Sequence, residues 1–480
     1  MFKNSLFDQP LKNLPLKTPL IVHEEDRLDK VVKLMVEKDY SFVVVQGKEG
    51  LGIITEKDFL QKVVYPQKNP SEIKAKEIAT FPLISLTTEN LLFEALLLMA
   101  ENRVRKVAVF EKGILQGILE DTDIISFQSK NLVSLLYQVE LSHDLEELAR
   151  LYTLVKEGVL NQIAEGFNPE YLGKYLAEIN DLFIKKTIEI TLKDLEGKPP
   201  SNFGVFVLGS EGRKEQSLKT DQDNTLIYKD LSEEKKEEVD RFFERFSSTF
   251  IDNLLKVGFP PCPGGVMVSN PLWRGDLKTW KNRLSNWLDC SQKEALLNLC
   301  IFLDFRMVYG DEEIEKELKE WITEKINQNK RLIICLAAEA IRFEPPLNFL
   351  GRFITEKEGP NKGKLDLKKA GIFPIVQGVR TLALEYNIWQ TNTFDRIEAL
   401  KKEGVLSLDF ASELKEGYRF ILSLQFLNQA QKIKKGQPPD NYLNPQELSK
   451  NERNQLKQVF KTIKTFQEFL FRKYNLRFFT

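Results

Sequence analysis

A repeated segment near the start of the chain limits most strongly what this protein can fold into. The stretch PLIVHEEDRLDKVVKLMVEKDYSFVVV, beginning at Pro19, aligns with PLISLTTENLLFEALLLMAENRVRKVAVF, beginning at Pro82. Each copy predicts a short strand, an amphipathic helix, two further strands and a closing helix. One copy alone would leave one face of its sheet bare, so we expect the two copies to pack together.

The two copies also share a short motif before the closing helix. It reads Gly-Ile-Ile-Thr from Gly52, with Asp58 three positions after the threonine. In the second copy it reads Gly-Ile-Leu-Glu from Gly117, with Asp123 in the matching place. The repeat and the motif together resemble the CBS domain pair.

The CBS resemblance implies an adenine-nucleotide site in each copy. In that family the threonine and the aspartate stand at a helix start, where a carboxylate can accept hydrogen bonds from both ribose hydroxyls. Thr55 and Asp58 would form the first site, and Asp123 belongs to the second. Glu120 replaces the hydroxyl residue of the second site and should repel a phosphate there. The alternative is that Thr55 and Asp58 only cap their helix.

Length, charge and cysteine usage set broad limits. At 480 residues the chain is too long for one core and predicts about three or four domains. Its 69 basic and 70 acidic residues nearly cancel, so the chain as a whole lacks the positive field of a dedicated nucleic-acid binder. The four cysteines are too widely spaced for a Cys-x-x-Cys knuckle and predict reduced thiols.

The apolar stretches are all short. None approaches the roughly 20 residues needed to cross a bilayer. The opening residues, MFKNSLFDQPLKNLP, carry no apolar core like that of a signal peptide. We therefore expect a cytoplasmic protein without a membrane partner.

A second informative segment follows residues 131–196, which we interpret as a helical connector. FGVFVLG, from Phe203 to Gly209, predicts a buried strand that ends in a Gly-Ser turn. SEGRKEQSL then predicts a short helix, and the TLIY tail of TDQDNTLIY predicts the next strand.

The acidic pair in TDQDN is the candidate catalytic centre. Asp221 and Asp223 are two residues apart, and residues i and i+2 of a strand point to the same face. Two carboxylates held that close need a cation, and Mg²⁺ fits because it combines carboxylate oxygens with substrate phosphates. Gly209 allows close backbone approach, Ser210 and nearby amides can bind phosphate, and Arg213 can neutralise more phosphate charge. These features predict a nucleoside-triphosphate site.

The turn and the acidic pair resemble the signature of the polymerase-β nucleotidyltransferase superfamily. The string GSEGRKEQSLKTDQDN is similar to the branch that contains protein-PII uridylyltransferases and CBS-linked nucleotidyltransferase-type proteins. CPGGVMVSNPLWRGDLKTW, FLDFRMVYGD and DLKKAGIFPIVQGVRTLALEY also resemble the CBS-linked proteins, whose C-terminal domain is described as substrate-binding. The resemblance implies Mg²⁺-dependent transfer of NMP to a protein acceptor, for example a PII-like regulator.

Two features depart from the family patterns. Many superfamily members have a third carboxylate on a later strand, but the candidate strand GGVMVSN carries no acid. Asp276 or Asp304 could replace it, although no spacing argument selects either. Gln425 and Asn428 stand where Arg and His are expected in the C-terminal domain.

Three functions follow from these observations. The first is a nucleotidyltransferase tuned by adenine nucleotide at the CBS pair. The second is a non-catalytic nucleotide-sensing module, which the missing third acid favours. The third is an RNA nucleotidyltransferase, which the near-neutral charge disfavours. An isolated Asp-x-Asp usually lies on a solvated strand edge, but the strand and turn before this one favour a metal-nucleotide site.

The predicted fold class is a multidomain α/β plus α protein. CBS pairs associate with one another in related proteins, which suggests a homodimer. The expected domains are an N-terminal extension (1–15), a tandem CBS pair (16–130, with copies at 16–66 and 76–128), a helical connector (131–196), a polymerase-β-type α/β domain (197–290) and a helical, substrate-binding-like bundle (291–480).

Overall fold

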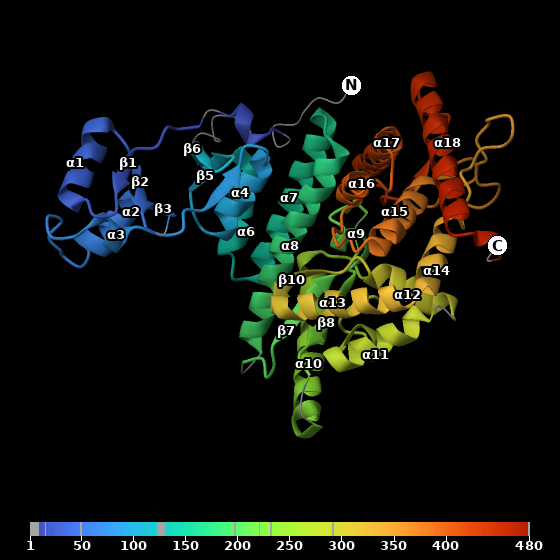
Figure 1. The fold of residues 1–480 in the computed structure, drawn as a ribbon, viewed down its shortest axis with the longest axis horizontal. Helices are drawn as coiled ribbons and strands as arrows, with labels where there is room; N and C mark the ends of the chain where they lie inside the picture. Colours follow the sequence, from blue (N-terminus) through green and yellow to red (C-terminus); the bar gives the residue numbers. More distant parts are fainter. Residues whose placement is uncertain are drawn as a thin grey trace. The chain divides into compact units, whose positions relative to one another are not determined.

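The chain folds into two compact units, Asn4–Glu140 and Leu141–Thr480, which we call the N-terminal and C-terminal units. Figure 1 shows the computed structural model in colours that follow the sequence. The structure describes residues 9–14, 16–48, 50–121, 130–195, 198–219, 221–230, 233–289 and 292–478.

The N-terminal unit contains both predicted repeats. Each forms a three-stranded sheet in which the first two strands are parallel and the last two antiparallel. The first repeat consists of β1 (Ile21–His23), α1 (Leu28–Lys38), β2 (Phe42–Gly47), β3 (Gly50–Thr55) and α2 (Glu56–Phe59), and α3 (Ala75–Ile78) follows it. The second consists of β4 (Ser85–Thr87), α4 (Leu92–Glu101), β5 (Lys106–Glu111) and β6 (Ile114–Glu120), and α6 (Lys130–Leu141) ends the unit.

The two repeats share a hydrophobic core. Phe42 and Val44 of the first repeat cluster with Ala108 and Ile118 of the second, and none of the four is more than 1% exposed. Burial of these side chains supplies the free energy that one repeat could not gain alone. The expectation that the copies pack together is confirmed.

The C-terminal unit is built from one mixed sheet and many helices. The sheet has the order β10-β7-β8-β9, with β8 and β9 parallel and the other neighbours antiparallel. Its strands are β7 (Phe203–Val207), β8 (Asn224–Tyr228), β9 (Arg274–Asp276) and β10 (Arg306–Gly310), with a separate ribbon of β11 (Leu365–Asp366) and β12 (Tyr442–Leu443). Its helices are α7 (Leu145–Glu165), α8 (Pro169–Asp194), α9 (Gly209–Gly212), α10 (Glu233–Val257), α11 (Leu277–Leu288), α12 (Lys293–Phe302), α13 (Glu312–Gln328), α14 (Lys330–Ala340), α15 (Phe373–Glu385), α16 (Thr393–Lys402), α17 (Leu408–Lys434) and α18 (Lys450–Lys473).

The expected connector is not a separate element. α6 falls with the repeats, whereas α7 and α8 belong to the C-terminal unit. α8 contacts α17 and β10 and buries residues on all its faces, including Lys186 and Thr187. A helix that is buried all round belongs to a core and does not act as a solvated linker.

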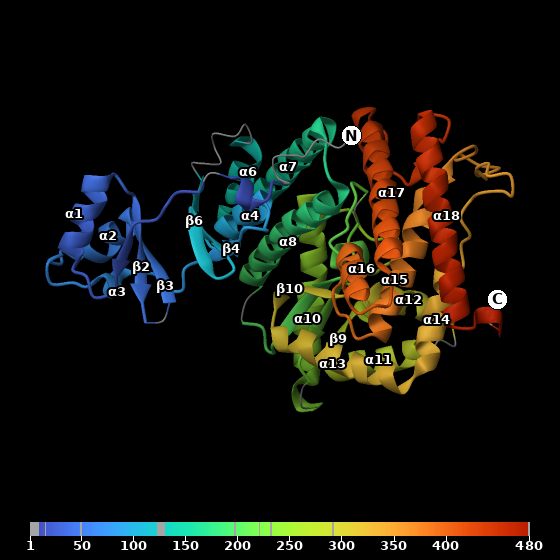
Figure 2. The same cartoon turned by 45° about the horizontal axis from the view of Figure 1, so that its top comes forward.

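The sheet also crosses the boundary expected at residue 290. β10 lies beyond that boundary and pairs with β7, and this long-range pairing leaves no local trace in the sequence. In Figure 2, α14 to α18 form the helical layer of the same unit, as the bundle expectation required. The segment GGVMVSN is not a strand, and the strand beside β8 is β9.

The tryptophans near β9 serve packing. Trp273, Trp280 and Trp287 are each at most 6% exposed and lie within 6.1 Å of one another, centroid to centroid. They form one cluster with Phe302 and Phe305. None of the helices in the described ranges is long and apolar enough to span a bilayer.

Candidate active site

A four-residue helix, α9, carries the Gly-Ser motif at the end of β7. All five residues of β7 are buried, and the backbone N–H of Leu208 donates to the carbonyl of Asp223 at 2.9 Å. Gly209 then adopts φ = +55°, a left-handed conformation that glycine reaches without steric cost. The turn predicted from the sequence therefore lies against the acidic segment.

The helix predicted over SEGRKEQSL is shorter than expected. α9 ends at Gly212, and Lys214 has φ = +54°. The side chains beyond it turn toward α8, where Lys214 pairs with Glu178 and Gln216 accepts from Asn180. These tertiary contacts replace the further helical turns that the local sequence favours.

The acidic pair directly precedes β8. Gln222 is 2% exposed and donates to the carbonyl of Phe259 at 3.0 Å, while the buried Asn224 accepts a backbone N–H at 2.9 Å. Asp221 and Asp223 alternate with these anchors and are partly exposed. Because alternate residues of an extended segment point to opposite sides, the anchors leave both carboxylates on the other side. β8 begins at Asn224, one residue after Asp223, so the shared side of the two carboxylates rests on the extended segment before the strand.

Burial and like charge act on Asp223. Burial and the negative charge of Asp221 raise the pKa of Asp223 from 3.8 to about 6, against a smaller lowering by a hydrogen bond from Cys262. The Oδ2 atom of Asp223 lies 2.9 Å from the position that a Cβ on Gly209 would occupy. A carboxylate whose charge is disfavoured by burial and by a neighbouring carboxylate, beside a bare backbone, suits a divalent cation and an anionic ligand.

A buried acid that sequence reasoning missed lies under this turn. Glu211 is 3% exposed, and its Oε1 atom has no hydrogen-bond partner among the described residues. Burial, with the charges of Asp181, Asp223 and Asp221, raises its pKa well above the ordinary value. Arg306 donates two hydrogen bonds to Asp181, of 2.6 and 3.0 Å. It also donates to the backbone carbonyl of Glu211 and so caps the end of α9. Because Glu211 stands in a polar stretch of the sequence, no local pattern predicts that its side chain is buried.

Arg213 occupies a different role from the one expected. Its Nε donates to Glu215 at 2.9 Å and its Nη1 donates to Asp304 at 2.7 Å, so two of its donor groups are engaged inside the protein. The prediction of a direct phosphate contact took no account of these partners, because Asp304 is 91 residues away in sequence. The charge of Arg213 still reaches Asp223 and lowers its pKa.

Asp304 is the centre of a buried ionic cluster. It is 0% exposed and accepts from Arg213, from Arg380, and from Arg396 at 2.8 Å. Burial alone would raise its pKa, but the three guanidinium groups outweigh burial and lower it to about 2. The cluster joins the motif segment to α15 and α16, and Glu215 adds a bond to Tyr418 of α17 at 2.9 Å. The three arginines carry three positive charges, and Asp304 and Glu215 carry two negative ones. The cluster therefore has an excess of one positive charge.

Neither suggested third carboxylate is placed to join the acidic pair. Asp304 is saturated by arginines. Asp276 pairs in register with Tyr228, five residues from Asp223, or roughly 16 Å along the strand. Its side chain caps α11 by accepting from Thr279 at 2.7 Å. In the described part of the chain, no three His, Cys, Asp or Glu side chains are grouped to hold a metal ion.

A lysine of the C-terminal helical region also acts on Asp223. The charge of Lys368, at the start of the turn before α15, lowers the pKa of Asp223. A chain of hydrogen bonds joins the two segments. The backbone N–H of Lys219 donates to Gln429 at 3.3 Å, and Gln429 donates to the side chain of Asn441 at 3.4 Å. The backbone carbonyl of Asn441 accepts from Leu367, the neighbour of Lys368, at 2.9 Å. Sequence reasoning missed Lys368 because it lies far along the chain.

The two substituted positions of the C-terminal domain support this same chain. Gln425 donates to the side-chain oxygen of Asn441 at 2.8 Å, and Asn428 donates to the carbonyl of Tyr442 at 3.2 Å. Both amides therefore position the 441–442 segment.

In the first CBS-type site, the carboxylate of Asp58 is bonded to residues of its own segment. Asp58 accepts from the backbone N–H of Thr55 at 2.9 Å and from its hydroxyl at 2.7 Å, and pairs with Lys62 at 2.8 Å. This is the capping arrangement anticipated as an alternative. It uses the same carboxylate that a ribose would require.

In the second CBS-type site, the acidic side chain of Glu120 forms ion pairs with two lysines. Glu120 is 4% exposed and pairs with Lys17 at 2.7 Å and Lys106 at 3.1 Å. Its charge is therefore neutralised locally, which weakens the repulsion expected of it. Asp123 lies outside the described residues.

The fold and the site define a nucleotidyltransferase-type domain behind a CBS pair. Residues 11–65 and 75–130 match the CBS domain, and residues 154–294 match the family described as "Putative nucleotidyltransferase DUF294". Residues 330–474 match the "Putative nucleotidyltransferase substrate binding domain". The architecture inferred from the repeat and the motif is confirmed.

Individual relatives cover smaller parts of the chain. An uncharacterized protein of Methanocaldococcus jannaschii is 26% identical over 136 residues, which cover 26% of this chain and 73% of that protein. One of Methanopyrus kandleri is 37% identical over 90 residues, 18% of this chain and 46% of that protein. The crystal structure of an uncharacterized conserved protein from Pyrococcus horikoshii matches 26% of this chain and 94% of its own, with 27% identity and a TM-score of 0.24.

Proposed function

We propose that this protein is a Mg²⁺-dependent nucleotidyltransferase that transfers NMP from an NTP to a protein acceptor. The observation that carries the proposal is the alternation in TDQDN, in which the side chains of Gln222 and Asn224 anchor the segment, while Asp223, two residues after Asp221, lies against Gly209.

Asp221 and Asp223 would hold the ion, since partly exposed carboxylate oxygens are the ligands that Mg²⁺ prefers. The bound ion would neutralise charge on the phosphoryl group during transfer. An acceptor hydroxyl oxygen would bond to the α-phosphorus as the bond to pyrophosphate breaks, and the hydroxyl proton would pass to water. The chain's contribution is positioning and a positive field, to which the excess charge of the Asp304 cluster adds.

We assign Lys368 as the residue that contacts the triphosphate in place of Arg213. The hydrogen-bond chain through Gln429 and Asn441 holds its turn beside the acidic segment. Replacing Lys368 by Gln should raise the KM for MgNTP about 10-fold, and Lys368→Arg should restore most of the loss. Lys369→Gln is the matched control, because Lys369 is also exposed and lies 4.0 Å from Asp366. Equal KM values for the two Gln variants would remove Lys368 from the site.

The acceptor is expected to bind the helical domain that matches the substrate-binding family. A PII-like regulator is the acceptor class that the sequence resemblance suggests. An adenine nucleotide at the first CBS-type site would tune transfer by binding one conformational state more tightly than another.

The test follows label from each α-labelled NTP into macromolecules of a cell extract from the source, with purified protein and Mg²⁺. Wild type is compared with Asp221→Asn/Asp223→Asn, and Asp276→Asn serves as a control acid outside the site. We expect a protease-sensitive labelled band that only the double variant fails to produce. A nuclease-sensitive band would instead indicate an RNA acceptor.

The absence of a grouped third acid among the described residues favours one second candidate, a nucleotide sensor without turnover. Wild type that binds MgNTP but labels nothing, with and without adenine nucleotide, would favour the sensor.

A further inference from the structure

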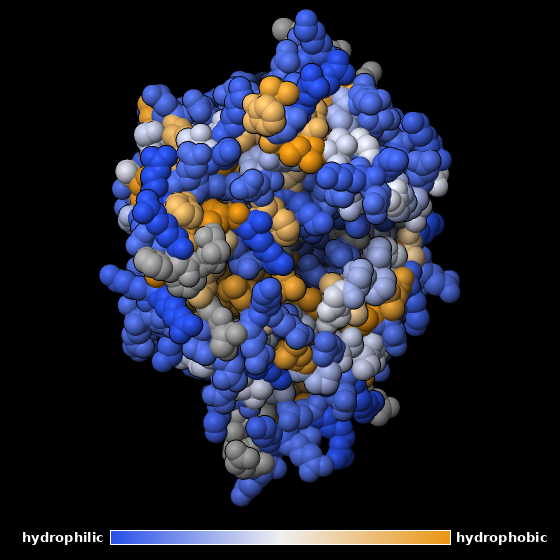
Figure 3. Space-filling model, turned by 90° about the vertical axis from the view of Figure 1, so that its right-hand side faces the viewer, coloured by the Kyte–Doolittle hydropathy of each residue, from blue (hydrophilic) through white to orange (hydrophobic). Residues whose placement is uncertain are grey.

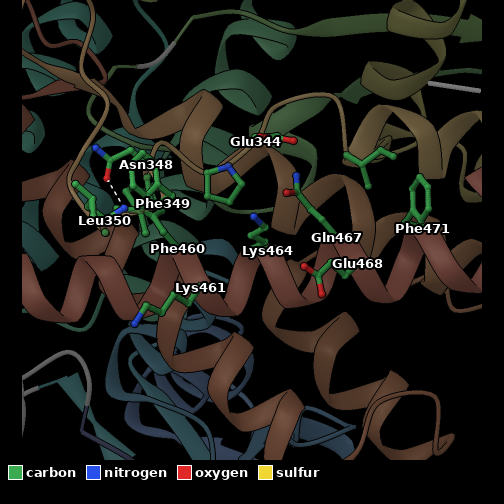
Figure 4. A pocket seen from close by; sticks show the side chains of 14 residues that line it. Glu344, Asn348, Phe349, Leu350, Phe460, Lys461, Lys464, Gln467, Glu468 and Phe471 are labelled. Atoms are coloured by element: carbon green, nitrogen blue, oxygen red, sulfur yellow. Dashed lines mark hydrogen bonds between the residues drawn. The ribbon is translucent and has the colours of Figure 1, made fainter. Parts of the chain in front are cut away.

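A groove lies between α18 and the loop that follows α14, in the C-terminal unit. Its volume is about 660 Å³, and Figure 4 shows its side chains. The buried Phe460 contributes to its apolar floor, together with Ile341 and Leu347. Gln467 donates to two carbonyls of the opposite segment, Ala340 and Phe343, and so ties the two walls together.

The loop presents two large apolar side chains at the rim. Phe349 is 95% exposed and Leu350 is 62% exposed. On the face drawn in Figure 3, apolar residues reach the surface in patches among hydrophilic ones. The two side chains extend the apolar floor of the groove to the surface, and a contiguous exposed apolar patch is the kind of surface that marks an interaction site.

The rim is held in place before any partner binds. The side chain of Asn348 accepts from the backbone N–H groups of Leu350 at 3.0 Å and Arg352 at 2.9 Å, and Gly351 turns the chain with φ = +69°. Because the turn is braced in this way, little conformational entropy would be lost there on binding.

The other wall is basic. α18 carries seven Lys or Arg residues and two Glu residues, in a chain whose net charge is −1. Lys461 and Lys464 line the groove, both are exposed, and neither forms an ion pair among the described residues. Of the acids that line it, Glu468 pairs with Arg472 at 3.3 Å, and Glu344 lies on the loop side.

We propose that this groove docks an acidic segment of the protein acceptor, with a Phe or Leu side chain entering between Phe349 and Phe460. The proposal rests on the proposed function for the existence of a protein acceptor. The two unpaired lysines fit a negative partner, and the apolar floor fits a partner with large side chains. RNA fits less well, because its backbone carries a negative charge at every nucleotide, whereas two acids, Glu344 and Glu468, interrupt the basic lining of this groove.

The experiment uses full-length protein and a fluorescein-labelled dodecapeptide of Asp, Glu, Phe and Leu, followed by anisotropy. A peptide with Lys in place of each acid and a U12 RNA are the comparison probes. We expect the acidic peptide alone to bind, and Lys461→Glu/Lys464→Glu and Phe349→Ser/Leu350→Ser each to weaken binding about 10-fold or more. Lys450→Glu, on the same helix but outside the groove, should change binding less than 2-fold.

Several results would overturn the proposal. Failure of the acidic peptide to bind, or equal binding by all variants, removes the groove as its site. Preference for U12 that is lost in the lysine variant would make the groove a nucleic-acid surface. Failure of the proposed function has a different signature: wild type labels no acceptor, whereas the peptide result is unaffected. Groove variants should retain fluorescent MgNTP binding at Asp221 and Asp223 while losing transfer to the acceptor.

Discussion

Gly209 lies against Asp223, so closely that a Cβ on residue 209 would stand 2.9 Å from the Oδ2 atom of Asp223. The absence of a side chain at this turn therefore sets where the second carboxylate of the pair can lie. Any replacement must move either the carboxylate or the backbone of α9.

Replacing Gly209 by Ala should abolish most transfer without unfolding the protein. Displacement of Asp223 is expected to reduce kcat/KM about 100-fold. Alanine in the left-handed conformation also costs about 1 kcal/mol of stability. Gly404→Ala is the control, because Gly404 has φ = +70° and no atom within 4 Å of the added Cβ. Equal activity in the two variants would contradict this account of the turn.

Replacing Asp304 by Asn should destabilise the C-terminal unit. Three buried guanidinium groups would lose their shared carboxylate, and breaking a buried ion pair in this way costs about 3–5 kcal/mol. Urea unfolding followed by tryptophan fluorescence measures the loss, since all five tryptophans lie in this unit. Asp409→Asn, at an exposed position, should change the free energy of unfolding by less than about 0.5 kcal/mol. A similar small change for Asp304→Asn would show that the cluster is not structural.

The advantage of Asp304 over Asn should disappear in acid. The folded-state pKa of about 2 is below the ordinary value of 3.8, so the unfolded chain binds the proton first. The stability from ionised Asp304 is therefore complete above pH 3.8 and is lost as the pH falls toward 2. Unfolding of wild type and Asp304→Asn at pH 5, 3 and 2 checks the sign. A gap that widens in acid would refute it.

Replacing Asp58 by Asn should remove the response to adenine nucleotide. We expect 1 mM AMP, ADP or ATP to raise the melting temperature of wild type, because ligand binding to the folded state stabilises it. In the Asn variant the ribose loses its acceptor, and the shift should vanish. Glu94→Gln is the control, since Glu94 caps α4 by accepting from the backbone N–H of Leu91. Loss of the melting-temperature shift in both variants would indicate that Asp58 only caps its helix.

The sequence alone determined the order of the domains and predicted a candidate centre for the site. Period-two alternation and a repeat are local patterns, so the two CBS-type sheets, β7 and β8 were all predictable. The shared side of Asp221 and Asp223 stays a prediction of the same alternation. A Gly-Ser turn after a buried strand is also predictable locally, because glycine can adopt the left-handed backbone conformation that the turn requires. Such features need no knowledge of distant residues.

Only the tertiary structure decided which charged groups act on the acidic pair and which are buried inside the protein. Arg213 was assigned to phosphate, but it pairs with Asp304, on which Arg380 and Arg396 also converge from distant segments. The charge of Lys368 acts on Asp223 from a distant segment, which hydrogen bonds through Gln429 and Asn441 join to the motif and which no local pattern shows. Long-range electrostatic partners depend on which surfaces the fold brings together. Local sequence therefore specifies the carboxylates, and packing of the C-terminal helices specifies their cations.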